Sequence, residues 1–195
     1  MKFLYLHGFN SGFKPEDQKI KTLEQLGKVE GITYNTYSSY DRILKNLLYV
    51  IGDSKDLVMV GTSLGGYWAY QVAKKLHVPS VIINPFYNPY QMLAPYVDIV
   101  NMNNVTGASN SLSLQVRNSY KDLQLSSEDY EDFVCKPLVL LDGGDEVLSA
   151  VQTENVLKKF TVKKFQGGSH QFTHMEQALP YIKNYIEAHN VVEYG

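Results

Sequence analysis

Short apolar runs alternate along this chain with longer stretches in which apolar residues recur every three or four positions. Continuous apolar runs bounded by glycine, proline or asparagine are typical of buried strands, and the second spacing is typical of helices with one buried face. The pattern predicts strands at residues 2–6, 32–37, 56–60, 78–83, 138–141 and 162–165. Helices are expected at residues 15–26, 42–51, 64–75, 150–160 and 175–188.

Strands that alternate with helices, and that are apolar throughout, indicate a parallel sheet covered by helices on both faces. We therefore predict an α/β fold with a mostly parallel six-stranded sheet. A chain of 195 residues is long enough for one such domain, spanning 1–195. Residues 86–134 interrupt the alternation with tyrosines, asparagines and methionines but no long apolar run, and a connection of that length is expected to form a small cap or lid.

Charge and composition narrow the range of partners. The formal net charge of −2 gives no strong attraction to nucleic acid or to an anionic membrane, and we expect neither as a partner. No apolar run approaches the ~18 residues of a membrane span, and the apolar start of the chain is too short for a secretion signal. A single cysteine, Cys135, cannot form an internal disulfide. These features favour a cytoplasmic location.

The strand predicted at 56–60 runs into the motif Gly-x-Ser-x-Gly at Gly61, Ser63 and Gly65, and a helix follows at once. This context is that of a nucleophile elbow, a sharp turn that holds a serine above the sheet. Glycines two residues to either side leave room for the turn. The motif predicts Ser63 as a nucleophile.

A serine hydroxyl needs a histidine to accept its proton and a carboxylate to orient that histidine, in the chain order Ser, Asp or Glu, His in hydrolases with such an elbow. Five histidines are available. His170 lies in a glycine-rich loop directly after the last predicted strand, where an imidazole can reach across the end of the sheet. We therefore predict His170 as the base.

Two aspartates compete for the role of the acid, both after the strand predicted at 138–141. Asp142 stands at the tip of the strand, where it could instead bind backbone amides of the loop. Asp145 lies beyond Gly143 and Gly144 and extends further toward the histidine. We favour Asp145 and keep Asp142 as the alternative.

The remaining parts of the site are expected in the first loop and at the elbow. The backbone N–H groups of Phe9 and Leu64 occupy the positions from which an oxyanion is usually stabilised. For His7 we expect a hydrogen bond that holds the first loop in place rather than a direct chemical role. We expect substrate contacts from Asn10, Tyr67 and Tyr87. No histidine pair with metal-ligand spacing stands out, so neither a metal nor an organic cofactor is expected.

Five segments together resemble the small bacterial YqiA-type esterases, the YqiA/YcfP-like group of the α/β hydrolase superfamily. They are residues 5–11 (YLHGFNS), 61–67 (GTSLGGY), 83–85 (INP), 144–148 (GDEVL) and 167–172 (GGSHQF). The resemblance spans nearly the whole chain. It implies a reduced α/β-hydrolase fold that lacks the first antiparallel strands, with Ser63, Asp145 and His170 at the triad positions and activity on short acyl esters.

The sequence thus favours a serine esterase that cleaves a small ester through an acyl-enzyme. A thioesterase or an amidase would use the same residues. A non-catalytic ligand-binding or interaction module on the same fold is the alternative from another class, because fold alone does not fix function.

Overall fold

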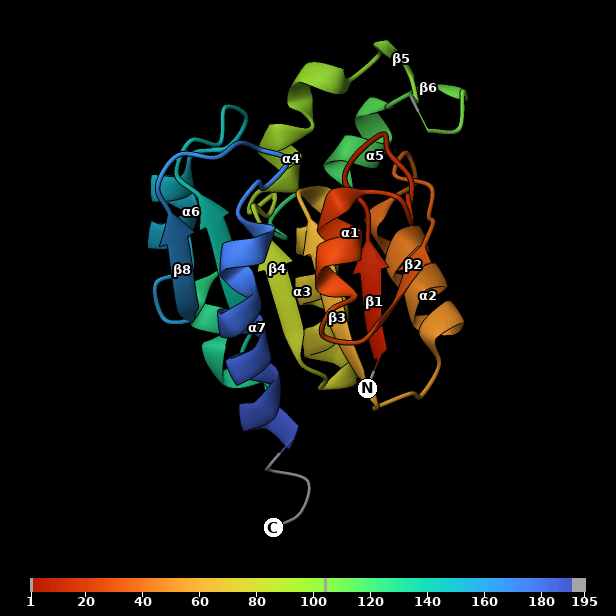
Figure 1. Cartoon of the computed structure of the whole chain (residues 1–195). Helices are drawn as coiled ribbons and strands as arrows, with labels where there is room; N and C mark the ends of the chain where they lie inside the picture. The colour runs from red at the N-terminus through yellow and green to blue at the C-terminus, as the bar shows by residue number, and fades with distance from the viewer. Residues whose placement is uncertain (1, 104, 191–195) are drawn as a thin grey trace.

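The computed structural model describes residues 2–103 and 105–190. Its main sheet contains six parallel strands in the order β2-β1-β3-β4-β7-β8 (Figure 1). The strands are β1 (Lys2–Leu6), β2 (Lys28–Ile32), β3 (Leu57–Thr62), β4 (Ser80–Ile83), β7 (Leu138–Asp142) and β8 (Thr161–Phe165). The predicted α/β class and six-stranded parallel sheet are confirmed.

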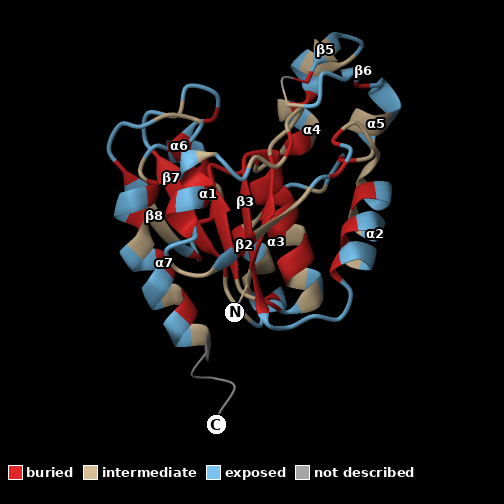
Figure 2. Ribbon diagram, turned by 45° about the vertical axis from the view of Figure 1, so that its right-hand side comes forward, coloured by how far each residue is buried: buried red, intermediate tan, exposed pale blue. Residues whose placement is uncertain are grey.

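Helices cover both faces of this sheet. They are α1 (Gln18–Leu23), α2 (Tyr40–Ile51), α3 (Leu64–Leu76), α6 (Ala150–Val156) and α7 (Met175–Asn190). Helices α1 and α7 pack on one face and share a core with strand residues such as Phe3 and Val60. Helices α2, α3 and α6 contribute to the core on the other face. The inner strands β1, β3, β4 and β7 are buried (Figure 2) because both of their faces are covered.

One predicted strand was placed wrongly. The second strand is Lys28–Ile32 rather than residues 32–37. As an edge strand it pairs with β1 through its backbone and keeps only Val29 buried, so it lacks an apolar run. The aromatic segment after it serves a different purpose, because Tyr34 is buried against the ring of His7 in the first loop.

The segment between β4 and β7 carries several short elements, and those within residues 89–118 lie above the carboxyl ends of the strands (Figure 1). These are α4 (Pro89–Met92), the 3-10 turn η1 (Ala94–Tyr96), β5 (Val100–Met102), β6 (Ser109–Ser111), α5 (Leu114–Asn118) and the 3-10 turn η2 (Ser127–Asp132). Strands β5 and β6 form an antiparallel hairpin whose residues are largely exposed (Figure 2).

Candidate active site

Ser63 occupies a sharp turn between β3 and α3. Its φ of 61° is a backbone conformation that is costly for a residue with a side chain. The turn is held by β4 and the loop after it, since the N–H of Ser63 donates to the Ile83 carbonyl at 3.0 Å and the Ser63 carbonyl accepts from the N–H of Phe86 at 3.0 Å. The side chain is therefore fixed at the carboxyl end of the sheet.

The two glycines of the motif are required by close backbone contacts. A Cβ on Gly61 would lie 2.1 Å from the carbonyl oxygen of Gly65, and a Cβ on Gly65 would lie 2.0 Å from the carbonyl oxygen of Leu6. Both distances are far below van der Waals contact. The elbow therefore closes only with glycine on either side of Ser63.

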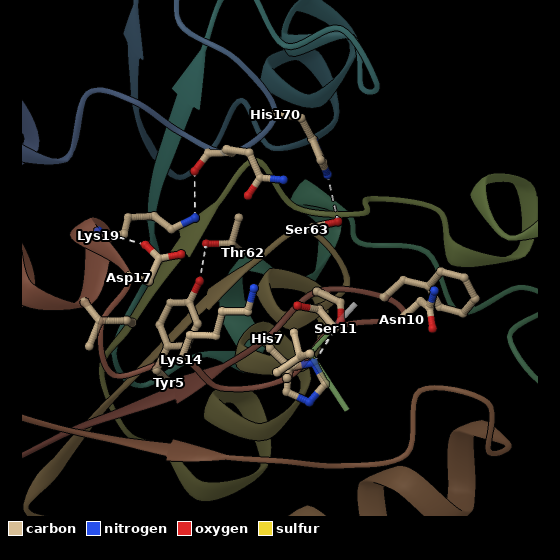
Figure 3. Close-up of a pocket in the computed structure, with 16 residues that line it drawn as sticks. Tyr5, His7, Asn10, Ser11, Lys14, Asp17, Lys19, Thr62, Ser63 and His170 are labelled. Carbon is tan, nitrogen blue, oxygen red and sulfur yellow. Dashed lines mark hydrogen bonds between the residues drawn. The ribbon is translucent and has the colours of Figure 1, made fainter. Parts of the chain in front are cut away.

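Ser63, His170 and Asp145 form a continuous chain of hydrogen bonds. His170 Nε2 lies 3.0 Å from Ser63 Oγ, a contact visible in Figure 3, and His170 Nδ1 lies 2.9 Å from Asp145 Oδ2. The other Asp145 oxygen, Oδ1, accepts the N–H groups of Val147 and Leu148, each at 2.8 Å. A carboxylate accepts only, so it fixes the proton of His170 on Nδ1 and leaves Nε2 free to accept from the serine hydroxyl.

Asp142 has a different set of contacts. Its side chain has no exposed surface, and Oδ2 accepts the N–H groups of Ser169 and Thr173 at 3.0 and 2.8 Å. Its Oδ1 lies 2.6 Å from Nδ1 of His174. Asp142 thus binds both ends of the loop that carries His170 and does not touch His170 itself in these hydrogen bonds.

Asn84 completes the support of this loop, and sequence reasoning missed it. Its Nδ2 donates to the carbonyls of Ser169 and His170, and its Oδ1 accepts the N–H of Asp142 at 2.9 Å. The residue has a φ of 39° directly before Pro85. An Asn-Pro step at the end of an apolar strand is the signal that could have marked it.

The loop after β1 lies directly beside the nucleophile. A Cβ on Gly8 would be 3.3 Å from Ser63 Cβ, so the backbone of this loop closely approaches the serine. Phe9 follows Gly8, and Leu64 begins α3, where N–H groups have no partner within the helix. Among the hydrogen bonds of residues 2–103 and 105–190, none uses either N–H.

His7 stabilises this loop from below the site. Its Nδ1 lies 2.9 Å from the Gly8 carbonyl, while Nε2 accepts the N–H of Tyr34 at 3.3 Å. Its ring also stacks on Tyr34, with 4.5 Å between ring centroids. Burial lowers the pKa of His7, so the neutral imidazole is favoured here.

A cavity of about 340 Å³ opens at Ser63 and His170 (Figure 3). Asn10 lines it, as expected. Tyr67 of α3 does not, because its ring is fully buried in the core and its hydroxyl donates to the Leu123 carbonyl. Tyr87 lies at a separate hollow and donates to Gln152. The structure therefore brings Asn10, but neither of these tyrosines, to the cavity.

Two kinds of feature are absent from the part of the chain that the structure describes. No helix there is long and apolar enough to cross a membrane. Nor do those residues include a cluster of three or more histidine, cysteine, aspartate or glutamate side chains that could hold a metal ion.

The parallel sheet, the elbow after β3 and the loops at the carboxyl ends of the strands define the α/β hydrolase fold. Among solved structures, Est1E from Butyrivibrio proteoclasticus is similar with a TM-score of 0.72 at 15% identity, over 96% of this chain and 87% of that one. Residues 2–187 match the family model described as "Uncharacterised protein family (UPF0227)". The chain belongs to this family.

Curated relatives agree with that assignment. The chain is 26% identical over 188 residues to the UPF0227 protein YcfP of Escherichia coli O9:H4, covering 92% of this chain and 96% of the relative. A UPF0227 protein of Shewanella sediminis is 30% identical over 103 residues, which span 49% of this chain and 56% of that relative. The resemblance to the YqiA/YcfP-like group is confirmed.

Proposed function

We propose that this protein is a serine hydrolase that cleaves short acyl carboxylic esters through an acyl-enzyme. The observation that carries the proposal is the hydrogen-bonded chain from Ser63 Oγ through His170 to the Asp145 carboxylate, with bonds of 3.0 and 2.9 Å. The Asp145 side chain is only 2% exposed and that of His170 is 14% exposed. A buried carboxylate that fixes the tautomer of a histidine beside a serine is the arrangement that activates a hydroxyl for attack.

In the first half of the reaction, Ser63 Oγ attacks the ester carbonyl while His170 Nε2 takes the hydroxyl proton. The N–H groups of Phe9 and Leu64 stabilise the negative charge on the carbonyl oxygen, since both are unused by other hydrogen bonds of the described residues. The tetrahedral intermediate formed by this attack then collapses. The bond to the alcohol breaks, and His170 returns its proton to the leaving alkoxide, which leaves an ester of Ser63.

In the second half, water takes the place of the alcohol. His170 removes a proton from water, the hydroxide oxygen bonds to the acyl carbon, and the proton passes to Ser63 Oγ as the acid leaves. Asp145 keeps its negative charge throughout and stabilises the imidazolium that forms twice in each cycle. No cofactor enters any of these steps.

The cavity supports a small substrate. Its volume of about 340 Å³ lies at the lower end of the range for ligand sites. Asn10 lines this cavity. Of the three residues predicted to contact substrate, it is the one that keeps this role in the proposal. Residues 86–134 act as the cap in this proposal, because Val105 lines the cavity from the far end of the β5–β6 hairpin.

The proposal is tested by measuring turnover of a panel of p-nitrophenyl and alkyl esters by the wild type and by Ser63→Ala. The variant should lose on the order of 10^3-fold or more in kcat and keep its fold. Ser80→Ala is the matched control, because Ser80 is also buried in the sheet and its hydroxyl has no partner among the described residues. Near-normal ester turnover by Ser63→Ala contradicts the mechanism, and absence of turnover in the wild type favours a binding module.

A further inference from the structure

The cavity beside Ser63 contains charged groups that the proposed chemistry does not use. Tyr5 and Thr62, which form a hydrogen bond with each other, line part of this cavity. Lys14, Asp17 and Lys19 also line it (Figure 3). Lys19 comes from α1, and the loop before that helix carries Lys14. Two cations and one carboxylate therefore face the same small space as the nucleophile.

Lys19 is unusual because its charge is buried without an opposite charge in contact. The residue is 8% exposed, and its Nζ donates to the carbonyl of Gln171 at 2.6 Å. Within residues 2–103 and 105–190, its ammonium forms no ion pair with a carboxylate. A buried ammonium without a counter-charge is unfavourable, so such a group is usually matched by an anion or by a ligand.

Asp17 does not fill that role. Its Oδ1 accepts the backbone N–H of Lys19 at 2.9 Å, which caps the start of α1. Burial lowers the pKa of Lys19, and the charges of Asp17 and Asp142 oppose that effect without making contact with the ammonium. An anion placed beside Nζ would stabilise the charged lysine.

Lys14 adds a second cation at the same cavity. Its side chain is half-buried, and no ion pair holds it within the described part of the chain. Lys19 is also close to the reacting groups, because Gln171, the acceptor of its ammonium, directly follows His170. A ligand that spans from Ser63 to Lys19 remains within one cavity of about 340 Å³.

We propose that Lys19 and Lys14 bind a carboxylate of the substrate, so that the ester cleaved at Ser63 carries a negative charge a few bonds from its scissile carbonyl; this inference rests on the function proposed above. The hydroxyls of Tyr5 and Thr62 form the polar wall between the two ends. Burial raises the pKa of Tyr5 to about 12, so its hydroxyl remains protonated beside the substrate. A neutral aliphatic ester would leave the buried ammonium without a carboxylate in contact.

The direct test compares esters that differ only by a carboxylate. Monoethyl succinate replaces the terminal methyl of ethyl butyrate by a carboxylate, and acetoxyacetate does the same for ethyl acetate, so the pairs place the charge on the acyl and on the alcohol side. At least one pair should favour the anionic ester by about tenfold or more in kcat/KM, as expected for a charge-assisted contact. Equal or lower kcat/KM for the anionic member of both pairs overturns the inference.

Variants locate the effect. Lys19→Met and Lys14→Gln should each lower the ratio of anionic to neutral kcat/KM about tenfold, and Lys19→Arg should restore part of it. Lys21→Met is the matched control, because Lys21 lies on α1 with an exposed side chain, and its ratio should equal that of the wild type. If Lys19→Met does not fold, the ratio of anionic to neutral kcat/KM measured for Lys14→Gln tests the inference. An unchanged ratio in the folded variants overturns the inference.

Binding separates this inference from the proposed function. Monoethyl succinate is titrated into Ser63→Ala by calorimetry, and into Ser63→Ala combined with Lys14→Gln. Binding that weakens about tenfold in the double variant supports the anion site even if no ester is hydrolysed. If the protein hydrolyses neutral esters but neither prefers anionic esters nor binds the half-ester, the proposed hydrolase function stands. The proposed carboxylate site is then contradicted.

Discussion

Asp142 and His174 form a second carboxylate–imidazole pair beside the pair of Asp145 and His170, with His174 Nδ1 2.6 Å from Asp142 Oδ1. The two aspartates are three residues apart and the two histidines are four apart, so the end of β7 with its following loop and the loop after β8 supply both pairs. Only the Asp145 pair continues to Ser63. The Asp142 pair anchors the loop that carries His170.

Replacing each aspartate by asparagine should therefore have different effects. Asp145→Asn should lower kcat on the order of 10^4-fold, because an amide reverses the hydrogen bond to Nδ1 and favours the wrong tautomer. Asp142→Asn should lower the free energy of unfolding by about 1–3 kcal/mol, because its amide N–H₂ cannot accept the loop donors. Ester kinetics and urea unfolding measure the two effects, and a larger loss of kcat in Asp142→Asn than in Asp145→Asn would reassign the acid.

The elbow glycines should tolerate alanine to different degrees. Gly65→Ala should destabilise the protein by about 3 kcal/mol or more, since its Cβ would meet the Leu6 backbone oxygen at 2.0 Å and the sheet would have to shift. Gly66→Ala should remain within about 1 kcal/mol of the wild type, because its nearest contacts lie at 3.1 Å and alanine favours the helix. Thermal and urea unfolding rank the pair, and equal stability of the two variants contradicts the steric argument.

Stability should depend on pH through His7. Burial lowers the pKa of His7 in the folded protein, whereas the unfolded chain has the ordinary value of about 6.5. Below about pH 6.5 the unfolded state therefore binds a proton that the folded state resists, and the free energy of unfolding falls as the pH falls.

The contribution of His7 is isolated by comparing variants between about pH 6.5 and 5. His7→Gln should show a shallower loss of stability than the wild type over this range. His77→Gln should keep the wild-type slope, because His77 is exposed at the end of α3. Parallel slopes for the wild type and His7→Gln would show that the buried imidazole does not carry the effect.

The β5–β6 hairpin should matter for substrate binding more than for chemistry. Asn103 joins it to the first loop by donating to the Ser11 carbonyl at 3.0 Å, and Asn10 donates back to the Met102 carbonyl at 3.2 Å. Asn103→Ala removes the bond to Ser11 and also the acceptor of the N–H groups of Val105 and Thr106, and it should raise KM about tenfold with little change in kcat. Ser109→Ala, an exposed position on β6, is the control. A loss confined to kcat would place the effect at the reacting groups instead.

The fold could be predicted because four of the six strands are continuous apolar runs, and burial on both faces requires that pattern. The edge strand Lys28–Ile32 could not, because backbone pairing alone places it against β1. Residues 32–37 have the composition of a strand, but Tyr34 packs on His7 through a contact between distant parts of the chain that local patterns do not encode.

The candidate site also has parts that the sequence predicts and parts that it does not. Ser63 and His170 stand in motifs whose spacing and loop position predict a nucleophile and its base. The support from Asn84, the pairing of Asp142 with His174 and the lysines of α1 and its preceding loop depend on how separate loops meet above the sheet. Tyr67 shows the limit within one helix, since its place in the first turn of α3 does not reveal whether its ring faces the cavity or the core.

The central claim is that Ser63 is a nucleophile activated by His170, and covalent labelling tests it most directly. The wild type, Ser63→Ala and Ser80→Ala are treated with a fluorophosphonate, and the adduct is located by peptide mass spectrometry while esterase activity is followed. The mechanism predicts one adduct per chain, at Ser63, in the wild type and in Ser80→Ala, with loss of activity in step with labelling and no adduct in Ser63→Ala. An adduct at another residue, or an active enzyme that resists labelling, contradicts it.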